Sequence, residues 1–281
     1  NSLHFLKPKK IYLRKSIIDL QKNEILINVK SCGMCGTDLK IFKKGSHRVK
    51  KNRIIGHEIS GQIIKVPNNQ SYFKKNSNII LGADIENLEN KNFALGHEVD
   101  GGFQKYMKID ANLLKKVPHY LTNKKINYDQ ASMTEPLACC INGLEKIGYK
   151  PNSVVVIFGA GTIGQLIAKL CIHSKSQKVY LIDSNNFKLK NGIKDKKIIK
   201  LKYSNFKKIL TKNILDKIKY TFVACSSAQA QKEAVKLAPE DSSVNFFAGL
   251  PKKKGQDILT PINTNAIHYK QLKIVGSHGS K

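Results

Sequence analysis

The chain has 281 residues, of which 41% are hydrophobic and 25% are charged. A chain of this length usually folds into two domains, and this hydrophobic fraction supplies a core and excludes wholesale disorder. Glycine (19) and proline (8) are too few for a collagen-like or low-complexity chain. The apolar runs are shorter than a membrane helix needs, and no secretory signal is recognisable, so we expect a cytoplasmic protein.

The 49 basic and 20 acidic residues give a net charge of +29, which raises nucleic acid or an anionic membrane as a partner. Arginine, whose planar fork recognises phosphate and base edges, stands only at positions 14, 48 and 53, which leaves 49 − 3 = 46 lysines. The lysines are spread along the whole chain without interleaved aromatic residues. We therefore expect a solvated surface without a specific nucleic-acid or membrane partner. A selected attraction for anions is the alternative.

The pattern of elements changes along the chain. The first half is rich in strands, which are predicted at 24–30, 57–66 and 78–81. In the second half, strands alternate with helices, as in a doubly wound parallel sheet. The strands are predicted at 154–158, 179–182, 220–224, 243–248 and 272–275, and the helices at 162–173, 228–237 and from a Ser204 cap to 215. A helix over 129–147 joins the halves, and Gly148 with Pro151 ends it. We expect an α/β protein with a β-rich domain over 1–150 and a doubly wound domain over 151–281.

A glycine motif, GAGTIG at 159–164, follows the predicted strand 154–158 and opens a helix. In this context G-x-G-x-x-G binds a dinucleotide. Gly159 allows the tight turn, Gly161 lets a pyrophosphate approach the helix N-terminus, and Gly164 lets helix and strand pack closely.

Asp183 ends the next predicted strand, 19 residues after Gly164. A carboxylate there accepts hydrogen bonds from a ribose diol and repels a 2′-phosphate, so the sequence predicts NAD rather than NADP. Lys188 either reaches the same ribose or phosphate or is one more surface lysine.

The six cysteines do not follow a secreted disulfide pattern, which indicates a reducing compartment. Cys32 and Cys35 form a C-x-x-C pair, which suits a redox pair or half of a zinc finger. The alternative pairs Cys35 with His57 and Glu58 of a GHE tripeptide, since thiolate, imidazole and carboxylate are zinc ligands and three ligands leave a catalytic position open. Glu135 offers a further carboxylate. A second GHE stands at 96–98, and we expect His97 to be a loop histidine rather than a ligand.

The segments GMCGTDLK, GHEISG, DGGFQKYM, EPLACC and GAGTIG occur in the order found in zinc-dependent medium-chain alcohol dehydrogenases. The chain resembles this family over nearly its whole length, and most closely the branch of polyol (sorbitol-type) and threonine dehydrogenases. The resemblance implies a GroES-like catalytic domain and a Rossmann cofactor domain with the active site between them. It also implies a homodimer or homotetramer.

The resemblance assigns roles to further residues. Cys35 and His57 bind zinc, Glu58 and Glu135 partner the metal or its water, and Thr37 passes on the substrate proton. Beside the glycines, Thr162 and Ile163 belong to the cofactor loop. The nicotinamide pocket falls, on looser matches, at Ser226 or Ser227, Leu250 and Ser277.

The sequence departs from the family at three places. The stretch 82–96 lacks the four cysteines of a structural zinc, so we expect one catalytic zinc only. Lys40 stands where many members have a proton-relaying histidine. The family also continues beyond the equivalent of Gly279, so the resemblance implies a fragment that lacks the segment completing the catalytic domain.

The sequence therefore predicts NAD-dependent oxidation of a secondary alcohol, namely a polyol, sugar or sugar phosphate, with zinc as Lewis acid. An L-threonine 3-dehydrogenase-like enzyme is the first alternative. A zinc-free quinone or enoyl reductase, a basic nucleic-acid-binding protein and an inactive NAD-binding remnant are the others.

Overall fold

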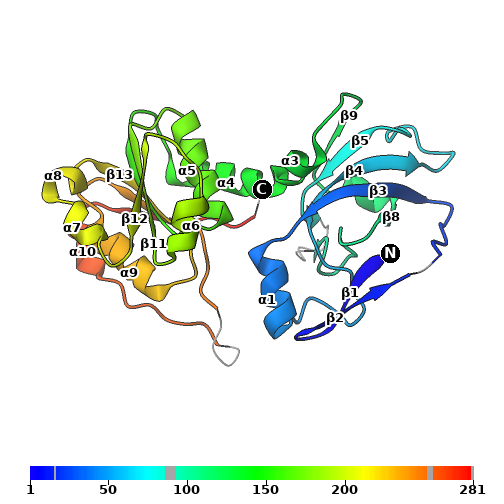
Figure 1. Cartoon of the computed structure of the whole chain (residues 1–281), viewed down its shortest axis with the longest axis horizontal. Helices are drawn as coiled ribbons and strands as arrows, with labels where there is room; N and C mark the ends of the chain where they lie inside the picture. Colours follow the sequence, from blue (N-terminus) through cyan, green and yellow to red (C-terminus); the bar gives the residue numbers. More distant parts are fainter. Residues whose placement is uncertain (16, 86–92, 252–255, 280–281) are drawn as a thin grey trace. The chain divides into compact units, whose positions relative to one another are not determined.

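The computed structural model describes residues 1–15, 17–85, 93–251 and 256–279. The chain forms two compact units, Asn1–Pro136 and Leu137–Gly279, each with its own sheet (Figure 1). Among the described residues, no helix is long and apolar enough to cross a membrane.

The first unit is built mainly from short antiparallel strands. Its central sheet has the order β8-β3-β4-β5-β9, and β1 with β2 and β6 with β7 form two-stranded sheets. The elements are β1 (Ser2–Lys7), β2 (Lys10–Arg14), β3 (Glu24–Gly33), α1 (Gly36–Lys44), β4 (Glu58–Lys65), β5 (Asn78–Leu81), β6 (Asp84–Ile85), β7 (Phe93–Ala94), β8 (Tyr106–Asp110), α2 (Ala111–Lys115), β9 (His119–Thr122) and α3 (Tyr128–Ser132).

Alternation of apolar residues fixes which face of this sheet is buried. Ile25 and Ile27 of β3 and Ile59 and Ile63 of β4 are all fully buried in one cluster, and they stand two or four residues apart. In a strand such residues share one face, so the pattern also fixes the pairing register. This register places the amino end of β4 beside the carboxyl end of β3, where Gly33 pairs with Glu58.

The second unit is a parallel sheet in the order β12-β11-β10-β13-β14-β15. This is the doubly wound order, with the switch point between β10 and β13. Its elements are β10 (Val154–Phe158), α5 (Thr162–His173), β11 (Lys178–Asp183), α6 (Asn186–Asn191), β12 (Ile198–Lys202), α7 (Phe206–Ile209), α8 (Lys212–Leu215), β13 (Ile218–Val223), α9 (Ala228–Leu237), β14 (Ser243–Phe246), α10 (Thr264–Tyr269) and β15 (Lys273–Gly276), after the carboxyl-terminal part of α4 (Thr134–Ile147).

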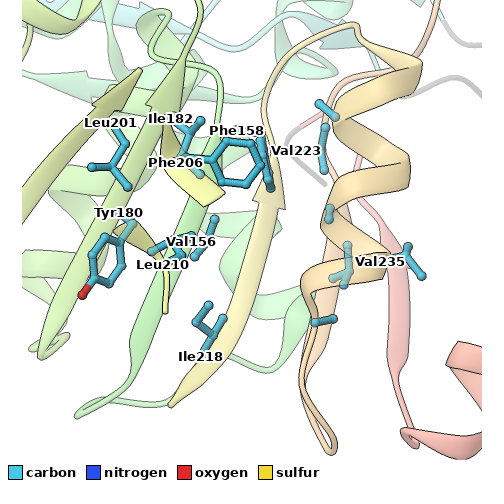
Figure 2. Close-up of a cluster of buried hydrophobic side chains, with 14 of the residues drawn as sticks. Val156, Phe158, Tyr180, Ile182, Leu201, Phe206, Leu210, Ile218, Val223 and Val235 are labelled. Atoms are coloured by element: carbon cyan, nitrogen blue, oxygen red, sulfur yellow. The ribbon is translucent and has the colours of Figure 1, made fainter. Parts of the chain in front are cut away.

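The central strand β10 is buried over its whole length because helices cover both faces of the sheet. On one face, the ring of Phe158 meets the ring of Phe206 edge-on at a centroid distance of 5.7 Å, among Ile182, Val223 and Val235 (Figure 2). On the other face, Val155 and Ile157 pack against α4 and α5. The expected fold class, a GroES-like domain with a Rossmann sheet, is thus confirmed.

The helix expected over 129–147 is instead two helices, α3 and α4, separated at Met133. A continuous helix would need an N–H at Pro136 and would bring its ring against the carbonyl of Ser132. Proline is tolerated only in the first turn, which is its place in α4. The units divide at Pro136, earlier than residue 150, because Cys140, Leu144 and Ile147 belong to the core of the second unit.

The helix expected after Ser204 was also wrong in detail. It is split into α7 and α8, with Asn205 rather than Ser204 at the cap of α7. Leu210 adopts φ −77° and ψ 73°, which is not helical and ends α7 after one turn. The hydroxyl of Ser204 donates to the Asn205 side chain instead.

The Phe158→Ala variant tests the core of the second unit. Phe158 is 1% exposed, so its removal leaves a cavity and lowers the free energy of unfolding by about 3–5 kcal/mol. Phe187→Ala, at a side chain 73% exposed, is the control and changes it by less than about 0.5 kcal/mol. Urea unfolding followed by circular dichroism measures both, and equal losses would contradict the assigned core.

Candidate functional site

Cys35 begins helix α1 and acts as its cap. Its Sγ accepts a hydrogen bond from the Thr37 N–H at 3.4 Å, and its own N–H donates to Asp38 Oδ2 at 2.9 Å. This is a capping box with sulfur in place of a hydroxyl.

His57 and Glu58 approach from the start of β4. His57 is 6% exposed and Glu58 5% exposed. The Glu58 carboxylate lies against the Cα of Gly33, where a Cβ would have no room, so its position depends on glycine at this site. The imidazole of His57 and the carboxylate of Glu58 are thus held at the end of a rigid sheet.

One ligand atom each of Cys35, His57 and Glu58 lies within 4.8 Å of the other two. A sulfur, an imidazole nitrogen and a carboxylate oxygen at such separations suit tetrahedral zinc, so the donor set fits the metal. Burial opposes a charge on His57, but the Cys35 side chain, Asp38 and Glu135 raise its pKa to about 9. The pKa of Glu58 is raised, mainly by burial. A metal binds the deprotonated imidazole and carboxylate, so its binding at this position would release protons.

Glu135 lies in the first turn of α4 and is buried. It acts electrostatically on both His57 and Glu58, so it is close to them, but it is outside the three-residue ligand group found among the described residues. Thr37 is partly buried in the first turn of α1, and Lys40 on the same helix is exposed.

Asp38 is a site residue that the sequence analysis did not identify. It is 3% exposed, and its second oxygen, Oδ1, accepts the Gly56 N–H at 3.1 Å and lies 3.8 Å from His57 Nδ1. The signal available was the capping-box spacing, because an acidic residue three positions after a cap bonds back to the cap N–H.

Cys32, the partner of Cys35 in the C-x-x-C pair, is a packing residue. Its sulfur lies so close to Gly56 and Gly102 that a Cβ on either would come within 3.0 Å of it. Burial, followed by the charge of Asp38, raises the pKa of the Cys32 thiol to about 12, which keeps it protonated and unreactive.

The loop 96–101 lies beside the ligand group. The rings of His97 and His57 have their centroids 5.9 Å apart, tilted by 43°. Burial, followed by the charges of Arg48 and His57, lowers the pKa of His97 to about 4, so its ring is neutral. Of the stretch 82–96 that lacks structural-zinc cysteines, residues 86–92 lie outside the described residues.

In the second unit the glycine loop is shaped for a phosphate. Gly159 adopts φ +106°, and a Cβ on Gly164 would collide with the Gly159 carbonyl. Gly161 caps α5 without a side-chain hydrogen bond, and a Cβ on it would meet nothing within 4 Å. The first N–H groups of α5, at Thr162 and Ile163, thus have no side-chain cap, and such a helix N-terminus suits an anion.

Asp183 is tied to this loop. Its Oδ2 accepts the Ala160 N–H at 2.7 Å, and its Oδ1 accepts the Asn185 N–H at 2.8 Å. Lys188 is exposed in the first turn of α6. Burial raises the pKa of the nearby Cys225, and the charge of Lys188 opposes that rise. The lysine thus lies in the neighbourhood of Asp183, whose charge acts on the same thiol.

The three residues expected near the nicotinamide follow the carboxyl ends of β13, β14 and β15. The Ser227 Oγ is used to cap α9, whereas Ser226 is exposed. Ser226 is therefore the better candidate for a residue near the nicotinamide. Leu250 is partly buried, and Ser277 donates to Asn245 Oδ1 at 3.2 Å.

Residues 21–119 match the family model described as the alcohol dehydrogenase GroES-like domain. D-arabinitol dehydrogenase 1 of Uromyces fabae is 29% identical over 67% of this chain and 56% of its own, and L-threonine 3-dehydrogenase of Bacillus licheniformis is 29% identical over 60% and 52%. A zinc-binding dehydrogenase of Sinorhizobium meliloti, solved with NADP, superposes with a TM-score of 0.85 at 21% identity over 99% of this chain and 84% of its own, which shows the fold alone.

These matches span about half the length of the curated relatives. Together with the fold and the ligand group, they define a two-domain protein with a GroES-like domain that carries a candidate metal site and a Rossmann domain. The chain carries an alcohol dehydrogenase GroES-like domain and is similar to polyol and threonine dehydrogenases.

The pair of Arg48 and Glu98, next to His97, predicts a pH-dependent contribution to stability. Burial alone raises the pKa of Glu98, but the Arg48 guanidinium and the Ala94 N–H outweigh it and hold the pKa below its ordinary 4.5. A depressed carboxyl pKa stabilises the fold above the unfolded pKa, and this stability is lost as the pH falls through the folded pKa.

We therefore expect Glu98→Gln to lower the free energy of unfolding by about 1–2 kcal/mol at about pH 7, with the deficit shrinking toward about pH 3. Urea unfolding at both pH values measures it. The exposed Glu240→Gln is the control, and a deficit that does not depend on pH would contradict the ion pair.

Proposed function

We propose that this protein is a zinc-dependent polyol dehydrogenase that oxidises a secondary alcohol with NAD. The observation that carries the proposal is the convergence of Cys35, His57 and Glu58 ligand atoms within 4.8 Å. The doubly wound sheet with an open glycine loop supports a nicotinamide cofactor.

Cys35, His57 and Glu58 hold one catalytic zinc per chain, and Glu135 serves as an alternative carboxylate ligand or partner of its water. Bound there, zinc supplies a Lewis acid for the substrate oxygen. Asp38 fixes the backbone around Cys35 and before His57, and burial of His57 and Glu58 excludes bulk water from their side of the site.

Thr37 is the residue that takes the substrate proton. Its N–H donates to Cys35 Sγ, so its backbone is fixed relative to the ligand group. Lys40 is one helical turn further along α1 and is exposed. The proton would therefore pass to solvent through water rather than through a relaying histidine.

The cofactor is NAD rather than NADP. Gly159, Gly161 and Gly164 shape the phosphate loop, with Thr162 and Ile163 at the helix N-terminus. The Asp183 carboxylate, supported by the neighbouring Lys188, would accept hydrogen bonds from a ribose, and its negative charge would disfavour a 2′-phosphate. Ser226, Leu250 and Ser277 would hold the nicotinamide, which would supply the hydride acceptor.

The substrate class rests on the relatives, which include D-arabinitol, D-xylulose and sorbitol enzymes. A polyol, sugar or sugar phosphate is therefore the leading substrate, and L-threonine the alternative, since a threonine dehydrogenase also matches. Both homo-oligomerisation, as dimer or tetramer, and a cytoplasmic location remain predictions.

Cys35→Ala tests the metal site. The parent protein, purified without added zinc, is expected to hold about one zinc per chain by elemental analysis, and the variant close to none. Polyol-dependent reduction of NAD should disappear with the metal, while binding of NAD to the second unit persists. The Cys139→Ala variant is the control. Zinc retained by Cys35→Ala would contradict the site, and a parent without zinc would favour a remnant that only binds NAD.

Asp183→Gly tests cofactor choice. Loss of the carboxylate is expected to lower the preference for NAD over NADP by about tenfold, because a hydrogen-bonded ribose partner and a repulsive charge disappear together. Asp183→Asn keeps an acceptor for the Ala160 N–H and controls for a disordered loop. Dissociation constants from fluorescence titration give the ratio, and an unchanged preference in both variants would show that Asp183 does not contact the ribose.

A further inference from the structure

We infer that His97 is a positioning residue, whose ring packs against His57 and fixes the orientation of that imidazole for the metal. The inference rests on the metal site of the proposed function and adds to it a residue from a separate loop. His97 belongs to the second GHE tripeptide, whose histidine we expected to be a loop residue rather than a ligand.

The first step concerns what holds the His57 ring. A metal-binding histidine usually donates its other ring N–H to a carboxylate or carbonyl, which fixes the ring. His57 Nδ1 is buried without a hydrogen-bond partner among the described residues, and Asp38 Oδ1, at 3.8 Å, is beyond hydrogen-bond distance. The His57 ring is therefore oriented by its side-chain hydrogen bond with Cys35 and by packing, and the ring packed against it is His97.

The second step concerns the backbone under the two rings. Gly102 N–H donates to the Gly56 carbonyl at 2.8 Å, and Gly101 N–H donates to the Ile54 carbonyl at 2.8 Å. A Cβ on Gly96 would lie 2.9 Å from the Gly56 carbonyl oxygen, and one on Gly101 would collide with it. The loop 96–101 is thus held against the segment leading to His57, which fixes the backbone of His97 relative to that of His57.

The third step concerns two arginine pairs that hold the loop. Arg48 Nε donates to Glu98 Oε1 at 2.6 Å and Nη2 to Oε2 at 2.9 Å, a two-bonded fork directly after His97. Arg53 Nη1 donates to Asp100 Oδ1 at 2.9 Å. Two of the three arginines in a lysine-rich chain are used here. At Arg48 the planar fork makes two parallel bonds that a lysine could not reproduce.

Other roles for His97 fit less well. It is not among the residues whose ligand atoms converge on Cys35, so the described residues do not support a fourth ligand. Its Nδ1 is buried without a partner, so the ring contributes through shape rather than through a protein hydrogen bond.

The test is metal affinity, measured by competition of Co²⁺ between the full-length protein and a chromophoric chelator. The thiolate-to-cobalt absorption band reports the geometry around Cys35. We expect His97→Ala to weaken Co²⁺ binding by about 10–100-fold and to alter the band. His97→Phe keeps a ring and is expected to bind within about threefold of the parent, whereas His97→Asn keeps a nitrogen and is expected to resemble His97→Ala.

His119→Ala is the matched control, because His119 packs against Tyr72 and Phe73 in the same unit without contacting the ligand group. It should leave Co²⁺ affinity unchanged. If His97→Ala fails to fold, Arg48→Lys replaces it. This variant keeps the charge, loses the fork, and is expected to weaken binding about threefold or more.

Parent-like affinity in His97→Ala, or in Arg48→Lys where that replaces it, would overturn the inference. Rescue by Asn but not by Phe would overturn it in favour of a hydrogen bond. Failure of the proposed function is distinguishable, because Cys35→Ala would then also leave Co²⁺ binding unchanged.

Discussion

A single buried carboxylate organises the metal domain. Asp38 accepts one hydrogen bond from the N–H of Cys35 and one from the N–H of Gly56, the residue before His57. The two backbone segments that carry the ligand group are thus tied through one side chain that is almost fully buried. A buried carboxylate without such partners would be very costly, so the two bonds and the burial depend on each other. Helix α1, the start of β4 and the ligand spacing all follow from this arrangement.

Much of the fold could be predicted because the relevant signals are local. Strand β10 and helices α5 and α9 have the predicted bounds, since a continuous apolar run and a glycine turn specify the first two and an apolar stripe the third. Helix α1 was missed because its cap is a cysteine, which is not among the usual capping residues. Strand β12 was not predicted because lysines interrupt its apolar residues, which weakens the strand pattern. The break between α3 and α4 depended on Pro136, which the apolar stripe alone did not take into account.

The residues of the candidate site also fall into those with a local sequence signal and those without one. Cys35, His57 and Glu58 stand in short motifs whose residue types indicate a metal, and the structure brings them together. Arg48 with Glu98, and Arg53 with Asp100, are 50 and 47 residues apart in sequence, so no local pattern could pair them. The rarity of arginine was the one available hint. The approach of His97 to His57 likewise depends on glycine contacts between distant segments, which only the folded chain displays.

The bare N-terminus of α5 has a consequence for the lifetime of the protein. With glycine as its cap and no side chain bonded to the first N–H groups, this helix end depends on water or on an anion for its hydrogen bonds. A dinucleotide that binds only the folded state at 100 times its dissociation constant adds about 2.7 kcal/mol to the free energy of unfolding. The unfolded fraction, which proteases cleave, then falls as the dinucleotide concentration rises. The cellular abundance of this chain would therefore follow the supply of its cofactor.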